Sequence, residues 1–144
     1  MGIKPRFRNK ELKFLSVPIL IQTPHKRLKT EFIIDTGSPY TILNYTDSIR
    51  LGIPHHTKSE LVRIGGREYQ SYISKCEIIL KSINNDRITE TIYIRVLKPS
   101  STKINELENL DRLPNILGLD FLLSYKFICD ISNNEIYLEK AENQ

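Results

Sequence analysis

The chain has 144 residues, of which 40% are hydrophobic and 26% are charged, and its formal net charge is +4. This length fits one domain with a single core, and no apolar run approaches the length of a membrane-spanning helix. Basic residues occur along the whole chain and are densest over 4–13, but no stacking aromatic groups or known module accompany them, which disfavours a nucleic-acid-binding function.

The two cysteines, Cys76 and Cys129, have neither a zinc-type spacing nor a disulfide-rich pattern, so we expect buried free thiols. The adjacent pair His55-His56 has no third ligand at a suitable spacing and is expected to lie in a solvated loop. The sequence therefore predicts no metal and no cofactor. The first ten residues contain no apolar segment of the signal-peptide type, which favours a cytoplasmic protein.

Apolar residues alternate with polar ones in short runs, which is typical of strands. Strands are predicted at 14–22, 29–34, 76–80, 88–96, 126–131 and 135–139, and a two-stranded hairpin is predicted at 61–73. Helical spacing is weaker and is found at 46–52 and 119–125. Many short strands and one helix near the end predict an all-β, closed barrel-like fold with one short helix in the second half of the chain.

Two positions refine this prediction. Pro18 cannot donate a hydrogen bond, so its strand should lie at an edge or contain a bulge. Gly65-Gly66 stands between two alternating arms, and a glycine pair of this kind favours a two-residue hairpin turn with positive φ angles. We expect mobility at the tip of this hairpin, because few residues anchor it.

The segment Asp35-Thr36-Gly37-Ser38 is the strongest chemical signal, because it follows the apolar run 32–34 directly. Such a run is expected to place a carboxylate at the end of a buried strand. Chance alone would produce the tripeptide in a chain of this length on the order of a few per cent of the time, and it also makes an ordinary turn. The tripeptide by itself therefore does not identify a function.

Two carboxylates about 3 Å apart cannot both be charged and share one proton, an effect best known from the aspartic-protease dyad. One carboxylate then takes a proton from water while the other gives a proton to the carbonyl under attack. Gly37 would let the backbone approach the carboxylate, and the Thr36 hydroxyl would bond to a facing loop. Ser38 would donate a hydrogen bond to the outer oxygen of Asp35.

A second segment, Ile116-Leu117-Gly118, makes the pattern specific. Together with 32–38, the hairpin residues Ile64, Gly65 and Gly66, and the continuation 119–122, the chain resembles the retropepsin-like aspartic proteases. After Gly118 it is most similar to the cellular, DNA-damage-inducible type. The resemblance covers 12–139, which leaves a basic arm over 1–11 and a tail over 140–144.

This resemblance implies an aspartic endopeptidase that acts as a homodimer, with one Asp35 from each subunit on the two-fold axis. It also implies that the hairpin around Gly65-Gly66 is a flap that closes over an extended peptide substrate. The segment Ile116-Leu117-Gly118 would cross behind the aspartate loop, with the following helix beneath it.

The chain departs from the viral members of the family. Leu119 stands where they have an arginine, and Pro39-Tyr40 stand where its carboxylate partner would be, so that ion pair is absent. The stretch 99–114 is also longer than in viral members.

Two other functions are compatible with parts of the sequence. A non-catalytic peptide-binding or dimerisation module with the same fold is the alternative, although the complete Asp-Thr-Gly-Ser argues against it. A small basic nucleic-acid binder would show affinity that falls steeply with salt.

Overall fold

The structure is a computed structural model that describes residues 2–3, 6–7, 15–54, 58–82, 85–100, 109–111, 113–130, 132–133 and 135–140. Strands dominate it, as the alternating pattern predicted. They are β1 (Gly2–Ile3), β2 (Arg6–Phe7), β3 (Leu15–Gln22), β4 (Arg27–Ile34), β5 (Ile42–Leu43), β6 (Glu60–Ile64), β7 (Arg67–Lys81), β8 (Arg87–Lys98), β9 (Asn115–Leu117), β10 (Tyr125–Asp130) and β11 (Glu135–Lys140). The helices are α1 (Tyr45–Arg50) and α3 (Leu119–Leu122), and residues 109–111 are also helical.

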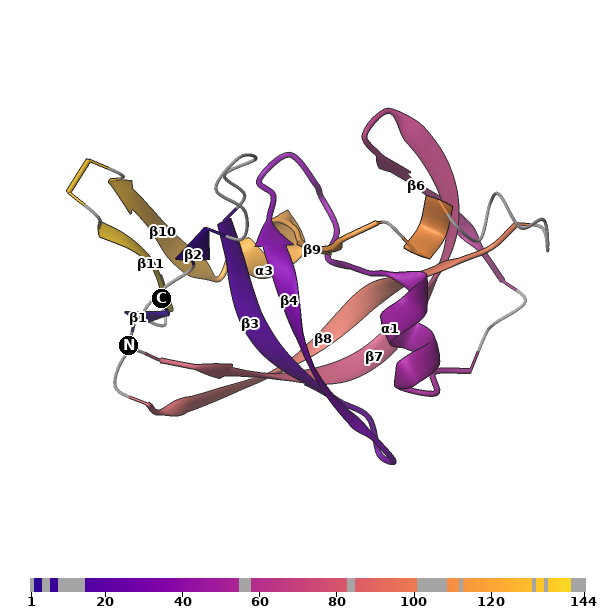
Figure 1. The fold of residues 1–144 in the computed structure, drawn as a ribbon, viewed down its shortest axis with the longest axis horizontal. Helices are drawn as coiled ribbons and strands as arrows, with labels where there is room; N and C mark the ends of the chain where they lie inside the picture. Colours follow the sequence, from indigo (N-terminus) through magenta and orange to yellow (C-terminus); the bar gives the residue numbers. More distant parts are fainter. Residues whose placement is uncertain are drawn as a thin grey trace.

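The larger sheet closes on itself. Its strand order is β2-β3-β4-β9-β5-β8-β7-β6, and an additional pairing joins β3 to β7, so the strands from β3 round to β7 form a mixed barrel (Figure 1). The second sheet has the order β1-β11-β10. The predicted all-β, barrel-like fold is therefore confirmed.

Pro18 lies within β3, where Ser16 pairs with β2 and the residues from Leu20 onward pair with β7. Between these two pairings β3 has β4 as its neighbour, with Pro18 opposite Glu31. The strand therefore accommodates the missing N–H at a break in one of its two ladders, in line with the expected edge or bulge.

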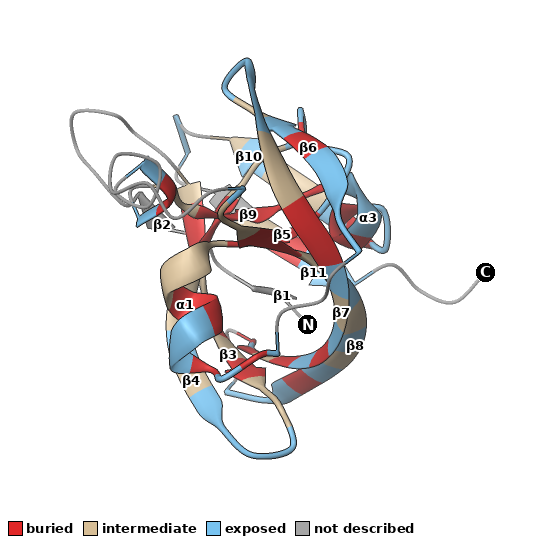
Figure 2. Cartoon of the chain, turned by 90° about the vertical axis from the view of Figure 1, so that its right-hand side faces the viewer, coloured by how far each residue is buried: buried red, intermediate tan, exposed pale blue. Residues whose placement is uncertain are grey.

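The strands pack around two groups of buried apolar side chains. The larger group fills the barrel and includes Phe32, Ile78 and Ile94, all of which are 0% exposed. The smaller group joins the strands near the aspartate loop to the base of the β6–β7 hairpin and consists of Ile42, Val62, Leu97, Leu110 and Ile116. Figure 2 shows the buried residues of β5 and β9 at the centre of the molecule and an exposed hairpin tip.

Some element limits differ from the prediction. The second arm of the hairpin predicted at 61–73 and the strand predicted at 76–80 form one long strand, because β7 continues from Arg67 to Lys81 and pairs with β8 over most of its length. The helix predicted at 119–125 ends at Leu122, and Tyr125 already belongs to β10. Helical spacing extended the prediction too far, because Leu123 is 79% exposed and does not share the buried face of Phe121 and Leu122.

The predicted N-terminal arm contributes strands to both sheets. Gly2–Ile3 pairs with β11, and Arg6–Phe7 pairs with β3. His55, His56 and most of the stretch 99–114 lie outside the described residues. Within the described part of the chain, no helix is long and apolar enough to cross a membrane.

Candidate active site

Asp35 follows β4 directly, and the strand fixes its backbone. Phe32 is buried in the barrel and Ile33 is also buried, whereas Asp35 is half-buried and borders solvent. The backbone N–H of Asp35 donates to the carbonyl of Leu117, 3.1 Å away, which extends the parallel pairing of β4 with β9 by one bond. The carboxylate therefore stands at the end of a strand that is supported by its neighbour.

A tight turn after Asp35 orients the carboxylate. The backbone N–H of Gly37 donates to Asp35 Oδ1 over 2.9 Å, and the N–H of Ser38 donates to the Asp35 carbonyl over 3.2 Å. A Cβ atom on Gly37 would lie 3.1 Å from Asp35 Oδ1, which is tighter than ordinary contact. Glycine at this position thus permits the close approach between backbone and carboxylate that the sequence suggested.

Ser38 has a different role from the one expected. Its hydroxyl donates to the carbonyl of Tyr40 over 2.7 Å instead of donating to the Asp35 carboxylate. Ser38 is 8% exposed, so its side chain lies beneath the loop, where a backbone carbonyl is the nearest acceptor. Thr36 is exposed on the outer side of the turn.

The segment Ile116-Leu117-Gly118 lies behind this loop. Strand β9 runs between β4, with which it is parallel, and β5, with which it is antiparallel. The N–H of Leu119 then donates to the Ser38 carbonyl over 2.8 Å, and that of Asp120 donates to the Pro39 carbonyl over 3.2 Å. The start of α3 is thereby bonded to the backbone of the aspartate loop.

Gly118 is required for space and not for its backbone angles. Its φ of −99° and ψ of −175° are open to any residue. A Cβ atom here would lie 2.2 Å from the Tyr40 carbonyl oxygen and 2.8 Å from that of Ser38. Only glycine allows α3 to begin this close to the loop.

Asp120 on α3 binds the segment that follows the aspartate loop, a role that the sequence did not predict. Its carboxylate accepts from Thr41 twice, from Oγ1 over 2.6 Å and from the backbone N–H over 3.0 Å. Thr41 Oγ1 also accepts from the Gly118 N–H over 3.1 Å. This bonded group joins the segment after Asp35 to the start of α3, and its only sequence signal is a carboxylate two residues after Gly118.

A buried polar network lies further behind the site and was also missed. Asn115 Nδ2 donates to Asp47 Oδ2 over 2.7 Å, and Thr30 Oγ1 donates to the same oxygen over 2.7 Å. Asn115 Oδ1 accepts from the backbone N–H of Asn44 over 2.8 Å. Asn115 and Asp47 are 2% and 5% exposed. These bonds join α1, β4 and β9, so they fix the strand that carries Asp35 relative to the strand behind it.

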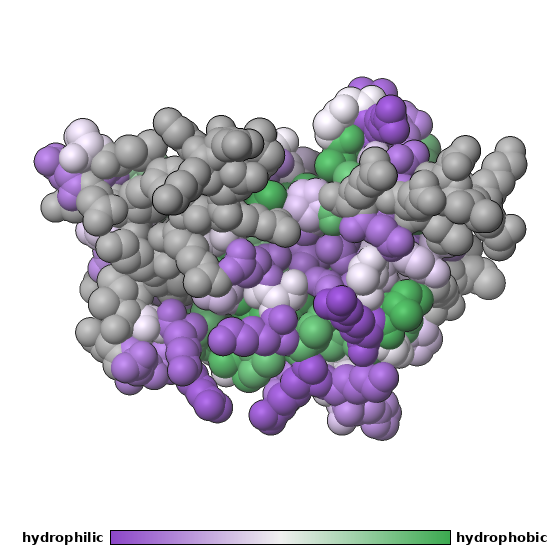
Figure 3. All heavy atoms as spheres, in the orientation of Figure 1, coloured by the Kyte–Doolittle hydropathy of each residue, from purple (hydrophilic) through white to green (hydrophobic). Residues whose placement is uncertain are grey.

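The predicted flap residues form the tip of the β6–β7 hairpin. Gly65 and Gly66 have φ angles of +59° and +80°, which confirms the predicted turn with two positive φ values. Figure 1 places this hairpin and the loop after β4 on the same side of the barrel. In Figure 3 the hairpin projects from the body, with hydrophilic atoms at its tip and hydrophobic atoms beneath. None of the hydrogen bonds that hold Asp35 and Ser38 involves the hairpin.

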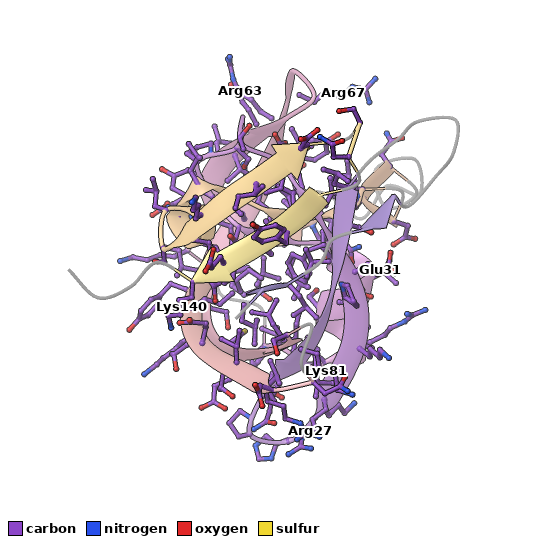
Figure 4. All side chains as sticks on the ribbon, turned by 90° about the vertical axis from the view of Figure 1, so that its left-hand side faces the viewer. Arg27, Glu31, Arg63, Arg67, Lys81 and Lys140 are labelled. Atoms are coloured by element: carbon purple, nitrogen blue, oxygen red, sulfur yellow. The ribbon has the colours of Figure 1, made fainter. Side chains whose placement is uncertain are left out.

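The tip also carries exposed arginines. Figure 4 shows Arg63 and Arg67 pointing away from the body of the protein. Arg63 pairs with Glu68 across the hairpin at 3.3 Å, and both side chains are more than half exposed. This ion pair lies within the hairpin itself, whereas Ile64, next to the turn, packs against the smaller apolar group.

Two titratable side chains, Tyr72 and Cys76, are buried on β7 beyond the base of this hairpin. Burial raises the pKa of Tyr72 from 10.0 to about 12, with smaller contributions from Cys76 and Tyr45. Burial also raises the pKa of the Cys76 thiol, and a hydrogen bond with the Ser74 side chain partly offsets this by lowering it.

The expectation of two buried thiols was wrong for Cys129, which is exposed on β10. Within the described residues, no group of three or more His, Cys, Asp or Glu side chains is arranged to hold a metal ion.

Comparisons with known proteins bear on the fold. No protein-family model and no curated protein matches the sequence. Among solved structures, the chain is similar to a retropepsin-like aspartic protease from Rickettsia conorii, with a TM-score of 0.56 and 18% sequence identity. The similarity covers 96% of this chain and 87% of that one. The chain therefore has the retropepsin-like fold that its sequence motifs implied.

Proposed function

We propose that this chain is an aspartic endopeptidase that cleaves peptide bonds as a homodimer, with Asp35 of each subunit in one shared site. The observation that supports it most is the setting of Asp35. Its backbone is bonded to β9, its carboxylate accepts from Gly37, and its side chain borders solvent. This arrangement holds a carboxylate in a fixed direction without burying it, which suits a group that must meet both a partner and a substrate.

The proposed chemistry needs two carboxylates and no covalent intermediate. At a separation of about 3 Å they share one proton, because two negative charges so close repel strongly. The ionised carboxylate takes a proton from a water molecule, which attacks the substrate carbonyl carbon. The protonated carboxyl gives its proton to the carbonyl oxygen. The resulting diol collapses and its C–N bond breaks. The carboxyl that took the proton from water gives it to the departing amine nitrogen, and the other carboxylate takes a proton from a diol hydroxyl, which restores the starting pair.

Exposed apolar side chains beside the loop fit a second copy of the chain at this place. Leu119 on α3 and Leu123 directly after it are 37% and 79% exposed, and Tyr40 is 39% exposed. Leu119 adjoins the loop, since its N–H bonds to the Ser38 carbonyl. An isologous dimer would cover these side chains and bring the two Asp35 loops together on its axis.

The β6–β7 hairpin would act as the flap. An extended substrate would lie between the hairpin and the loop and would form main-chain hydrogen bonds as an added strand. The free thiols of Cys76 and Cys129 fit a reducing, cytoplasmic setting.

Replacement of Asp35 tests this proposal. Asp35→Asn keeps the size of the side chain and removes the charge, so it should abolish cleavage of an unfolded protein substrate and leave the dimer intact. Cleavage should be measured from about pH 3 to pH 7, where the apparent pKa values of such dyads fall. Equal cleavage by both proteins, or none by either, would reject the protease. In the second case, binding of the unfolded substrate would instead favour a peptide-binding module.

A further inference from the structure

Arg95 lies where three parts of the molecule meet. On β8 it pairs with Ile42 of β5 and with Ile73 of β7. Its backbone N–H donates to the Thr41 carbonyl over 2.9 Å, at the end of the segment that follows Asp35. The backbone of Arg95 is thus bonded directly to the candidate active site.

The side chain of Arg95 reaches two further groups. Its guanidinium carbon lies 4.2 Å from the centre of the Tyr40 ring, in the geometry of a cation–π contact. Its Nη1 forms an ion pair with the carboxylate of Glu60, the first residue of β6. The Arg95 side chain is only 14% exposed, so water screens this pair less than it screens a surface pair.

The ion pair between Arg95 and Glu60 joins two strands that are not neighbours in the sheet. In the sheet order, β6 is a terminal strand that pairs with β7, and β7 separates it from β8. Arg95 on β8 therefore reaches past β7 to hold Glu60. The planar guanidinium can stack on a ring with its face while it donates from its edge, which a lysine cannot do.

The other contacts at the hairpin base do not lead to the aspartate loop through a side chain, as those of Arg95 do. Ser71 Oγ donates to the Glu60 carbonyl over 2.9 Å, and Ser59 Oγ donates to Gln70 Oε1 over 2.6 Å. Both bonds join β6 and its preceding residue to β7 and so close the hairpin on itself. Val62 packs in the smaller apolar group, and the β7 arm continues the ladder with β8 from Gln70 onward. The Arg95 contacts are directional and lead to the aspartate loop.

We propose that Arg95 is a positioning residue that fixes the base of the β6–β7 hairpin to the segment following Asp35, through Glu60 on one side and Tyr40 on the other. This inference rests on the proposed function, in which the hairpin is the flap. The contact sets the hairpin at one angle over the aspartate loop. Loss of the contact lets the hairpin swing and weakens its closure on a substrate.

Amide hydrogen exchange over β6, residues Glu60–Ile64, tests the proposal in the free protein, because these residues pair with β7 across the hairpin. Arg95→Gln and Glu60→Gln should each raise the exchange rate there by roughly 5–30-fold, the factor that one or two kcal/mol produces. Tyr40→Leu should raise it less, because it leaves the Glu60 pair in place. The matched control is Arg63→Gln, which breaks the Arg63–Glu68 pair inside the hairpin and should not loosen its base.

The double variant E60R/R95E supplies a rescue. It restores the ion pair with reversed charges but not the contact with Tyr40, so exchange should return only part of the way to that of the parent protein. If Arg95→Gln does not fold, Glu60→Gln decides the matter, because Glu60 is 58% exposed and its loss spares the core. Unchanged exchange in Glu60→Gln, or an equal rise in Arg63→Gln, would overturn the proposal.

A kinetic measurement separates this inference from the proposed function. With a peptide substrate, Glu60→Gln should raise KM more than it lowers kcat, because hairpin closure is affected and Asp35 is not. If the parent protein cleaves nothing, the proposed function fails while the exchange result still stands on its own. If the parent protein cleaves and Glu60→Gln changes neither exchange nor KM, the inference about Arg95 fails alone.

Discussion

The aspartate loop and the β6–β7 hairpin face the same side of the barrel but are held in opposite ways. The loop is bonded to β9 and α3 by backbone hydrogen bonds from Asp35, Leu119 and Asp120. The hairpin ends in a terminal strand, and a Cβ atom added to Gly65 or Gly66 would meet nothing within 4 Å. One region is therefore fixed from behind, and the turn of the other has open space beside its two glycines.

This difference suits the two roles that we propose. A carboxylate that must meet its partner within a few tenths of an ångström needs a rigid support. A flap must open for a substrate and close over it, so it is expected among the less stable parts of the fold. The same chain provides both, by placing its glycines for close contact in one region and for positive φ in the other.

The largest effect is expected from a glycine in the rigid region. Gly118→Ala places a Cβ atom 2.2 Å from a backbone oxygen, so α3 must move away from the loop. We expect a loss of about 4 kcal/mol or more in the free energy of unfolding, measured by urea denaturation.

Gly65→Ala is the matched change in the hairpin. It meets no neighbouring atom, and its cost comes from the φ of +59° alone, which is about 1 kcal/mol. Equal losses in the two variants would contradict the distinction between a crowded loop and an open tip.

The buried network behind the loop should give the next largest effect. Asn115→Ala removes the donor to Asp47 and the acceptor for the Asn44 N–H, and it leaves a carboxylate buried with fewer partners. We expect a loss of roughly 3 kcal/mol in the same measurement. Asn109→Ala, at an exposed position, should stay within about 0.5 kcal/mol of the parent protein. A similar loss in both variants would show that the network does not support the loop.

The smallest effect concerns the hairpin base at alkaline pH. Burial raises the pKa of Tyr72 from 10.0 to about 12, so the folded state holds its proton more tightly than the unfolded state. Its contribution is complete below pH 10 and is lost as the pH rises toward 12. Tyr72→Phe should show a shallower decline of the urea midpoint between pH 9 and about 11. Identical slopes would show that Tyr72 is not held in its neutral form.

The sequence predicted the parts of the molecule that depend on local rules. Alternation predicted the strands, and the glycine pair predicted the hairpin turn at Gly65-Gly66. The order of Asp35-Thr36-Gly37 and Ile116-Leu117-Gly118 predicted the fold. The first two signals lie within a few residues of the features that they specify, and each of the two motifs is itself a short local pattern.

The missed contacts join residues that are far apart in the chain. Asp120 lies opposite Thr41, and Arg95 lies between Tyr40 and Glu60. Nothing near Arg95 in the sequence distinguishes it from any other arginine on an alternating strand. The expected bond from Ser38 to Asp35 was wrong for a related reason, because the direction of a side chain in a tight turn depends on what lies beneath the turn.

A mixing experiment tests the central claim most directly, because that claim is a site built from two chains. Parent protein and Asp35→Asn protein are unfolded together in varying ratios and refolded, and cleavage is measured at constant total protein. If each site needs two ionisable Asp35 side chains, activity falls as the square of the parent fraction, since mixed dimers have only one. Activity that falls in simple proportion to the parent fraction would show that each chain acts alone and would contradict the account.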